Sequence, residues 1–379
     1  VPALPDVQIG HSLPPRLKIV TPTAGEVESA SVTLETEAED QGGGISGLIL
    51  YQNGARVLAP GEKRQEGKIL HRSFRVALVE GENRLRVASA TADGSWESEP
   101  AEIVLRYEKP LAKSRLYVVA VGISRYADAN MNLSFASQDA RALAELFQRR
   151  GAALYEQVHL VTLIDDQAAK SGIQQALKQV GAQTRPQDTL LLFLAGHGAM
   201  IGQRYYFIPQ DFRKQAKRLE DDVRQQGLPA DELSDYLGAA AALKRILILD
   251  TCASGGALEV AMKARAGFEL RGAIERLSRT QGIFTIAASA ASEQAQEVKE
   301  LGHGVLSYAP LAGLGAVRGG PLVDKHAQPS GADQVVDVMD WFSFASGQVP
   351  RLTESYFGIS QEVQTSTQGA SFPLLPLAD

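Results

Sequence analysis

The chain of 379 residues contains one cysteine, Cys252, and carries no excess of positive charge. A single cysteine permits no disulfide within the chain, so cysteine usage says nothing about the redox compartment. No apolar stretch approaches the roughly 20 residues that a membrane-spanning helix needs. The formal net charge of -6 argues against a nucleic-acid-binding surface. We therefore expect neither a membrane span nor a nucleic-acid partner.

Apolar side chains, by contrast, make up 44% of the residues, which is ample for packed cores, and the length favours two domains. Residues 1–15 contain four prolines and suit an extended lead-in. Because the chain starts at Val1 rather than at a methionine, we expect a trimmed or processed product with further domains upstream.

Residues 16–108 show short alternating segments at regular spacing, which predict about seven β-strands. The clearest turn is Asn53-Gly54, which lies between two apolar runs and tolerates the positive φ of a type I′ hairpin. The pattern favours a small antiparallel sandwich, immunoglobulin-like in outline. The Cys…Trp…Cys core of antibody domains is absent, and no residue group in this part indicates catalysis.

Beyond a short linker, residues 115–379 show apolar strands that alternate with helices. This succession predicts an α/β domain with a mostly parallel sheet and helices on both of its faces. The expected strands are 116–121, 158–163, 190–194, 205–208, 246–249 and 283–288. The expected helices are 137–150, 173–180, 231–242, 305–313 and 338–346.

Two of these strands end in chemically useful residues, at the edge where open α/β sheets place ligands. The run 190–194 leads into His197. The run 246–249 leads through Asp250 to Cys252. A lone cysteine is most often a small buried hydrophobe. A histidine and a cysteine at the ends of two buried strands, however, supply a base and a nucleophile side by side.

Residues 115–379 resemble the caspase-like domain of bacterial cysteine peptidases, close to metacaspases and orthocaspases. The motifs that carry the resemblance are LYVVAVGISRY, NLSFASQDARAL, LAGHG, YYFIP, ILILDTCASGG and GHGVLSY. His197 precedes Cys252 by about 50 residues, and a histidine at about that separation upstream of the cysteine is also a caspase feature. The Gln-Ala-Cys signature of animal caspases is not present. The resemblance implies a cysteine endopeptidase with a dyad of Cys252 and His197.

In that chemistry a thiolate at Cys252 attacks the carbonyl carbon of a peptide bond, and His197 relays the proton to the leaving amine. Gly198 offers an unobstructed backbone N–H, which forms an oxyanion hole with the N–H of Cys252. The family resemblance implies the same two donors.

The substrate pocket is predicted from Asp250. A carboxylate two residues before the nucleophile does not favour the thiolate, so its presence needs another explanation. The resemblance implies that it pairs with a basic side chain at P1, the substrate residue before the scissile bond, so that cleavage follows Arg or Lys. An N-cap or a solvated strand-end acid is the alternative. The sequence also departs from the family pattern, because Ala195 and Ala253 stand where many metacaspases have serine and histidine.

Three further residues are candidates for the substrate pocket. Asp231 is a candidate because many metacaspases have an acidic cluster near this helix, although helix capping explains the residue as well. Ala288 and Ser289 belong to a run of small residues that suits a strand pairing with extended substrate. A tight crossover is the alternative for that run.

The segment after the cysteine strand is rich in basic residues, among them Lys263, Arg265 and Arg271. With a basic P1 pocket, these three residues are candidates for self-cleavage. A charged surface helix explains the same pattern.

We expect no metal or other cofactor, because one cysteine and six scattered histidines show no zinc-ligand spacing. Calcium dependence occurs in some related peptidases and is not assignable from these residues. His159 and His303 are predicted to be structural.

The predicted function is therefore cysteine endopeptidase, with a protein or peptide substrate. Two alternatives stay open. The first is a non-catalytic caspase-fold interaction protein, and the second is another thiol amidohydrolase. We expect a soluble bacterial protein, and the sequence does not choose between cytoplasm and periplasm.

Overall fold

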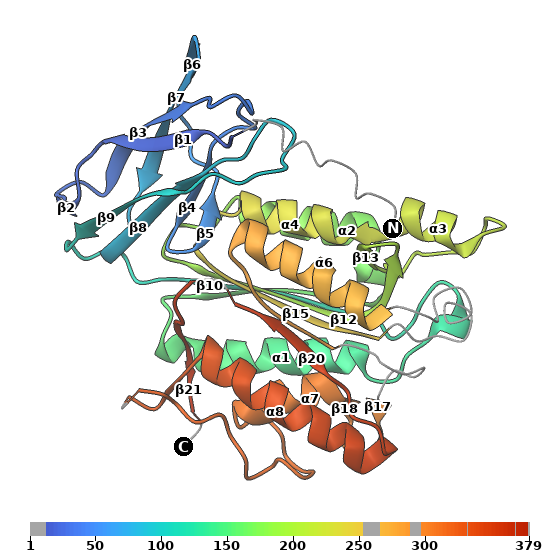
Figure 1. Cartoon of the computed structure of the whole chain (residues 1–379). Helices are drawn as coiled ribbons and strands as arrows, with labels where there is room; N and C mark the ends of the chain where they lie inside the picture. Colours follow the sequence, from blue (N-terminus) through green and yellow to red (C-terminus); the bar gives the residue numbers. More distant parts are fainter. Residues whose placement is uncertain (1–12, 253–265, 289–296, 332, 368, 378–379) are drawn as a thin grey trace, which may run out of the picture. The chain divides into compact units, whose positions relative to one another are not determined.

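The computed structural model describes residues 13–252, 266–288, 297–331, 333–367 and 369–377. The chain divides into two compact units, Val1–Ala112 and Lys113–Asp379 (Figure 1). The first unit is built of strands, and the second mixes strands with helices.

The first unit contains two sheets that share one core. Alternate residues of both sheets point into this core, among them Leu34, Phe74, Leu85 and Leu105. The four-stranded sheet has the order β1 (Arg16–Thr21), β3 (Ser31–Glu39), β7 (Ile69–Ala77), β6 (Lys63–Glu66). The five-stranded sheet has the order β2 (Gly25–Glu26), β9 (Ala101–Tyr107), β8 (Gly81–Ala88), β4 (Ile49–Gln52), β5 (Ala55–Val57).

The predicted hairpin at Asn53-Gly54 is confirmed. Strands β4 and β5 pair antiparallel around it, with φ of 51° at Asn53 and 88° at Gly54. The strands predicted for this unit are 17–20, 31–38, 73–78, 83–88, 101–107 and the two arms of the hairpin in 47–58, and they do not include β2 or β6. Each of these two is short and all of its residues are exposed, so neither has an apolar alternation that could reveal it.

The second unit is organised around a mostly parallel sheet, as predicted. Its main order is β11 (Val158–Ile164), β10 (Leu116–Gly122), β12 (Thr189–Ile201), β15 (Lys244–Cys252), β16 (Phe284–Ala288), β20 (Val363–Ser366). Only β20 runs antiparallel within this order, and its polar sequence VQTS did not indicate a strand. The end of β12 pairs antiparallel with β13 (Arg204–Phe207), which pairs with β14 (Leu228–Pro229).

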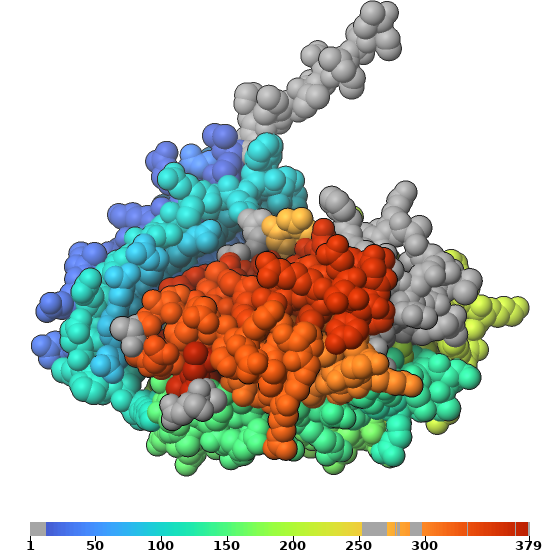
Figure 2. All heavy atoms as spheres, turned by 90° about the horizontal axis from the view of Figure 1, so that it is seen from below, coloured from blue at the N-terminus to red at the C-terminus, as the bar shows by residue number. Residues whose placement is uncertain are grey.

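Helices cover both faces of this sheet (Figure 1). On one face, Ile246 and Ile248 of β15 share a core with α1 (Ala136–Arg150), α7 (Val305–Gly313) and α8 (Val338–Phe357). On the other face, Leu247 and Leu249 share a core with α2 (Lys170–Gly181), α4 (Ala230–Ala239) and α6 (Ala266–Gln281). Seen from below, the orange and red part of the chain forms much of the surface over the face that α1, α7 and α8 cover (Figure 2).

Helix α8 is longer than the predicted 338–346. Its buried residues continue at helical spacing through Val349 and Leu352, and the internal Pro350 does not end it. The remaining elements are α3 (Leu219–Gln226), three 3-10 turns, η1 (Ala129–Met131), η2 (Gly151–Ala153) and η3 (Asp165–Ala168), and four short strands, β17 (Glu297–Val298), β18 (His303–Gly304), β19 (Val335–Asp337) and β21 (Pro373–Pro376).

Candidate active site

The carboxyl ends of β12 and β15 bring the predicted base and nucleophile together. The two strands are parallel neighbours, and His197 and Cys252 are partners in their register. Neighbouring strands lie about 4.8 Å apart, so the two backbones are adjacent. The backbone of Cys252 is described and its side chain is not.

His197 is held in one orientation by residues of the loop between β10 and α1. The ring is 1% exposed, and its Nε2 lies 2.7 Å from the carbonyl oxygen of Met131. A carbonyl only accepts, so Nε2 carries the proton and Nδ1 carries the lone pair of the neutral imidazole. In this tautomer Nδ1 is the ring nitrogen that can accept a proton.

Tyr126, from the same loop, also contacts this histidine. Its hydroxyl oxygen accepts the backbone N–H of His197 at 2.8 Å, and its ring centroid lies 5.0 Å from the imidazole. Burial raises the pKa of the Tyr126 hydroxyl above its ordinary value, so the group stays neutral. Sequence reasoning missed both Tyr126 and Met131. A contact made by a backbone carbonyl, such as that of Met131, cannot be inferred from the type of residue.

A buried carboxylate organises the loop that carries Tyr126 and Met131. Asp165 accepts the backbone N–H groups of Ser124 and Arg125 at 2.8 Å and 2.9 Å, and the hydroxyl of Ser137 at 2.7 Å. Burial acts to raise the pKa of Asp165, but these hydrogen bonds and the Arg125 guanidinium outweigh it and hold the pKa below its ordinary value.

Two glycines flank His197 because side chains would not fit. A Cβ at Gly196 would lie 2.7 Å from the hydroxyl oxygen of Tyr126. A Cβ at Gly198 would lie 2.8 Å from the Tyr205 ring and 3.0 Å from the Thr251 hydroxyl. The residue types at the histidine are thus required by close approach.

The backbone N–H of Gly198 does not donate to the neighbouring strand β13. The N–H of Ile208 donates to the carbonyl of His197 at 2.9 Å, next to the register pair of Gly198 and Phe207. In an antiparallel ladder this makes Gly198 and Phe207 a non-hydrogen-bonded pair, whose N–H groups point away from the partner strand. The N–H of Gly198 therefore points away from β13.

Two carboxylates converge beside this strand end. Asp250 follows Ile246 and Ile248 on the face covered by α1 and α7, and Ser307 of α7 donates a hydrogen bond to it. A Cβ at Gly304 would lie 2.9 Å from Asp250 Oδ2 and 3.2 Å from Asp139 Oδ2. Asp139 of α1 therefore faces the same glycine as Asp250.

Asp139 was not among the predicted site residues. It is 2% exposed and lies on the buried stripe of α1 with Ala136, Ala140 and Leu143. An acid is rarely found fully buried, so a carboxylate on the apolar stripe of an amphipathic helix was a usable signal. His303 and the backbone N–H of Gly304 both hydrogen-bond to it.

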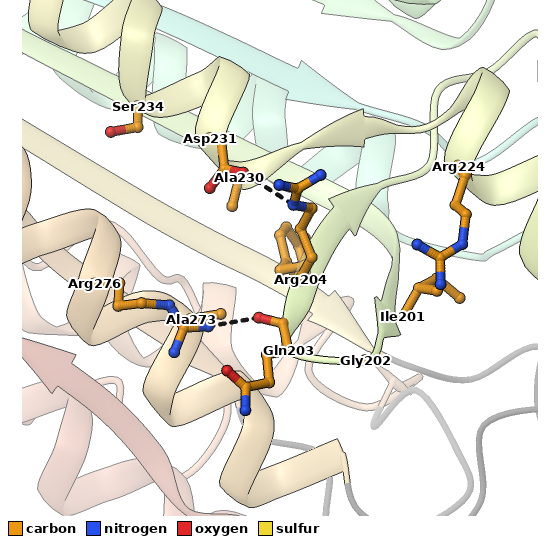
Figure 3. Close-up of a pocket in the computed structure, with 11 residues that line it drawn as sticks. Ile201, Gly202, Gln203, Arg204, Arg224, Ala230, Asp231, Ser234, Ala273 and Arg276 are labelled. Atoms are coloured by element: carbon orange, nitrogen blue, oxygen red, sulfur yellow. Dashed lines mark hydrogen bonds and ion pairs between the residues drawn. The ribbon is translucent and has the colours of Figure 1, made fainter. Parts of the chain in front are cut away.

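The structure does not bring Asp231 to Asp250. Asp231 lies in the first turn of α4, whose buried residues belong to the core on the opposite face of the sheet. It lines a cavity of about 570 Å³, where it pairs with Arg204 at 3.0 Å and is 68% exposed (Figure 3). Arg224 and Arg276 line the same cavity. Alternation along β15 and the placement of α4 thus separate this acid from Asp250.

The remaining predicted site residues fall into two groups. Ala288 ends β16, is 1% exposed and belongs to the same core face as Ile248. Arg271 is exposed on α6. Ser289, Lys263 and Arg265 lie outside the described residues.

Within the described part of the chain, no group of three or more histidine, cysteine, aspartate or glutamate residues could hold a metal ion. None of the helices in these ranges is long and apolar enough to cross a membrane.

The comparisons with known proteins identify the class. The caspase domain family matches residues 115–340, more than half of the chain, and the chain therefore belongs to that family, whose members are caspase-like cysteine peptidases with protein substrates. A search of curated proteins finds no match.

Three solved structures have some similarity to different shares of this chain. Protein GSU0716 from Geobacter sulfurreducens is 13% identical with a TM-score of 0.41, over 68% of this chain and 94% of that one. Dimeric latent PorU from Porphyromonas gingivalis is 16% identical with a TM-score of 0.23, over 30% of this chain and 12% of that one. The titin M3 domain is 23% identical with a TM-score of 0.20, over 26% of this chain and 99% of that domain.

Proposed function

We propose that this chain is a cysteine endopeptidase of the metacaspase and orthocaspase branch, in which Cys252 is the nucleophile and His197 the base. The observation that carries the proposal is the register of β12 and β15, which makes these two residues direct neighbours. The bond from His197 to the Met131 carbonyl adds to it, because it leaves the lone pair on Nδ1. The peptidase domain spans 115–379, and residues 16–108 form an immunoglobulin-like domain in front of it.

The reaction proceeds in two halves. Nδ1 of His197 takes the thiol proton, and the Cys252 sulfur forms a bond to the carbonyl carbon while the carbonyl electrons move to oxygen. The N–H groups of Gly198 and Cys252 stabilise this oxyanion. The C–N bond then breaks, the imidazolium gives its proton to the leaving amine, and a thioester remains. Water, deprotonated by His197, hydrolyses the thioester and restores the thiol.

The acidic pair Asp139 and Asp250 binds a basic P1 side chain. Both carboxylates face Gly304, a position without a side chain. Each charge-assisted hydrogen bond to Arg or Lys contributes about 1.5–3 kcal/mol. Arg gains more than Lys, because its planar guanidinium can bond two carboxylate oxygens at once.

Hydrolysis of fluorogenic peptides that end in Arg, Lys, Asp or Leu tests this proposal. The wild-type chain and Cys252→Ala are assayed in parallel, each with calcium and with a chelator. We expect cleavage after Arg and Lys that disappears in the variant. Cleavage after Asp alone would retain the peptidase and reject the acidic pocket. No cleavage by protein whose thiol titrates as reduced would favour the non-catalytic alternative, and activity confined to small amides would favour an amidohydrolase.

Self-processing follows from the same specificity. Lys263, Arg265 and Arg271 are the proposed sites, and Arg271 is exposed on α6. Intact-mass analysis of the wild-type enzyme should find a cut after at least one of them, which Cys252→Ala should lack. An uncut chain in a fully active preparation contradicts self-processing and leaves the peptidase proposal in place.

A further inference from the structure

The histidine of the Gly-His-Gly motif at 302–304 bonds directly to the buried acid of the proposed pocket. His303 Nδ1 lies 2.6 Å from Asp139 Oδ1, and the N–H of Gly304 donates to Asp139 Oδ2 at 3.1 Å. The two side chains are 15% and 2% exposed. Because a carboxylate only accepts, Nδ1 carries a proton. Both oxygens of Asp139 are thus held by donors from two consecutive residues.

The same short segment also holds the second acid. His303 and Gly304 form β18, which pairs with β17 and leads directly into α7. Ser307, in the first turn of α7, donates to Asp250. One stretch of five residues therefore contacts a carboxylate from α1 and a carboxylate from β15. The position of either acid relative to the other depends on that stretch.

The bond from His303 to Asp139 also affects the energy of the two carboxylates. A buried carboxylate is costly unless a donor or a charge compensates it, and two carboxylates at one place repel each other. The proton on His303 offsets part of both costs. His303 also lines a cavity of about 550 Å³ with Gln138, Glu300 and Tyr308.

We propose that His303 is a positioning residue that holds the Asp139 carboxylate beside Asp250 and thereby determines how tightly the enzyme binds an Arg or Lys side chain at P1. This inference rests on the proposed peptidase function with its basic P1 preference. Loss of His303 lets Asp139 turn away from Gly304 and weakens binding of the P1 charge. The Cys252 and His197 chemistry is unaffected, so KM rises while kcat is largely retained.

The test compares two peptides that differ only at P1, one with Arg and one with citrulline, its uncharged analogue. We expect His303→Leu to lower kcat/KM for the Arg peptide by about 10- to 100-fold, through KM, as for loss of one partner of a charge pair. The citrulline peptide should change by less than about threefold. His303→Asn should recover much of the Arg preference, because its amide N–H can still donate to Asp139.

Two controls separate this role from a general loss of structure. His326→Leu removes another half-buried histidine of the same unit, whose Nδ1 bonds the Ala312 carbonyl, and should leave the Arg to citrulline ratio unchanged. The rate at which iodoacetamide alkylates Cys252 should be the same in wild type and all variants. If His303→Leu loses its cooperative thermal transition, the pair His303→Asn and His303→Gln replaces it, and only the Gln variant, with its displaced amide, should lose the Arg preference.

An equal loss on both peptides, a loss in kcat with unchanged KM, or no change in the ratio would overturn the role of His303. A wild-type enzyme that cleaves after Asp or Leu and not after Arg would instead reject the basic P1 pocket itself, and this role with it. The two failures are therefore distinguishable by the wild-type specificity alone.

Discussion

Carboxylates at the two edges of the parallel sheet in the second unit receive hydrogen bonds from different kinds of donor. At the amino edge, Asp188 precedes β12, is fully buried, and is bonded by the guanidinium groups of Arg115 and Arg185. At the carboxyl edge, Asp139 and Asp250 receive hydrogen bonds from an imidazole, a backbone N–H and a hydroxyl. Asp188 and Asp139 are buried and Asp250 is half-buried, and the described hydrogen bonds to the acids at the two edges come from different kinds of donor.

In the proposed function, the amino edge contributes to stability and the carboxyl edge carries the chemistry. Two guanidinium groups that surround one carboxylate compensate its charge within the fold. Donors such as a hydroxyl or an N–H orient a carboxylate and leave its charge to act on a ligand. Open α/β sheets place ligands at the carboxyl ends of their strands, and His197 and Cys252 end neighbouring strands there.

The sharpest test of this comparison removes the dyad. Cys252→Ala and His197→Ala should each lower peptide hydrolysis by at least about 10³-fold, because neither member acts without the other. Thermal melting should show that both variants stay folded. His71→Asn, at a half-exposed histidine of the first unit, is the matched control and should keep full activity. If either dyad variant kept an activity close to that of the wild type, the reaction would not depend on Cys252 and His197 as proposed.

The next test neutralises acids on the two faces of the sheet. Asp139→Asn and Asp250→Asn should each reduce kcat/KM for an Arg peptide by about 10²-fold, since each leaves one fewer charge for P1. Asp231→Asn should leave it unchanged, because that residue lies on the opposite face of the sheet. Kinetics on Arg and citrulline peptides provide the readout. Equal sensitivity of Asp231 and Asp250 would contradict the separation of the two faces.

Asp188→Asn should act on stability and leave P1 selectivity unchanged. Removing the acid leaves Arg115 and Arg185 without their central partner, and we expect the free energy of unfolding at pH 7 to fall by about 2–4 kcal/mol. Denaturant unfolding measures this loss. If this variant changed the ratio of kcat/KM between the Arg and citrulline peptides, the assignment of stability to the amino edge and of specificity to the carboxyl edge would be contradicted.

The same residue predicts the direction of acid sensitivity. Burial acts to raise the pKa of Asp188, but hydrogen bonds from Arg185 and Arg115 outweigh it, so the folded pKa lies below the ordinary 3.8. A depressed folded pKa contributes stability that is complete above 3.8 and is lost as the pH falls through the folded value. Unfolding between pH 5 and pH 2 should thus be less pH-dependent in Asp188→Asn than in wild type. An identical slope would show that other carboxylates dominate acid unfolding.

The smallest effect is expected at Tyr126. Tyr126→Phe keeps the ring beside His197 but removes the oxygen that accepts the His197 N–H. An unsatisfied buried N–H costs about 1–3 kcal/mol, and we expect kcat to fall about 3- to 10-fold with KM unchanged. Steady-state kinetics check this. A loss as large as that of His197→Ala would mean that Tyr126 takes part in the chemistry itself.

Much of the fold was predictable because periodicity and turn chemistry are local. The apolar runs of β10, β12, β15 and β16 indicated buried parallel strands, and Asn53-Gly54 indicated its hairpin. Strands β6 and β20 escaped prediction, because edge strands with polar sequences carry no hydrophobic pattern. The Met131 carbonyl escaped for a different reason, since backbone acceptors are the same in every residue type.

The sequence by itself determined the strand ends that carry His197 and Cys252, because an apolar run followed by a small or polar residue is a local signal. Only the tertiary structure decided which acids face that edge. Asp139 and Asp231 both lie in the first turn of a helix and look alike in the sequence. They differ in the face of the sheet that their helices cover, and topology alone decides that face. The acid pair of the proposed pocket is therefore a property of the packed layers, not of any one segment.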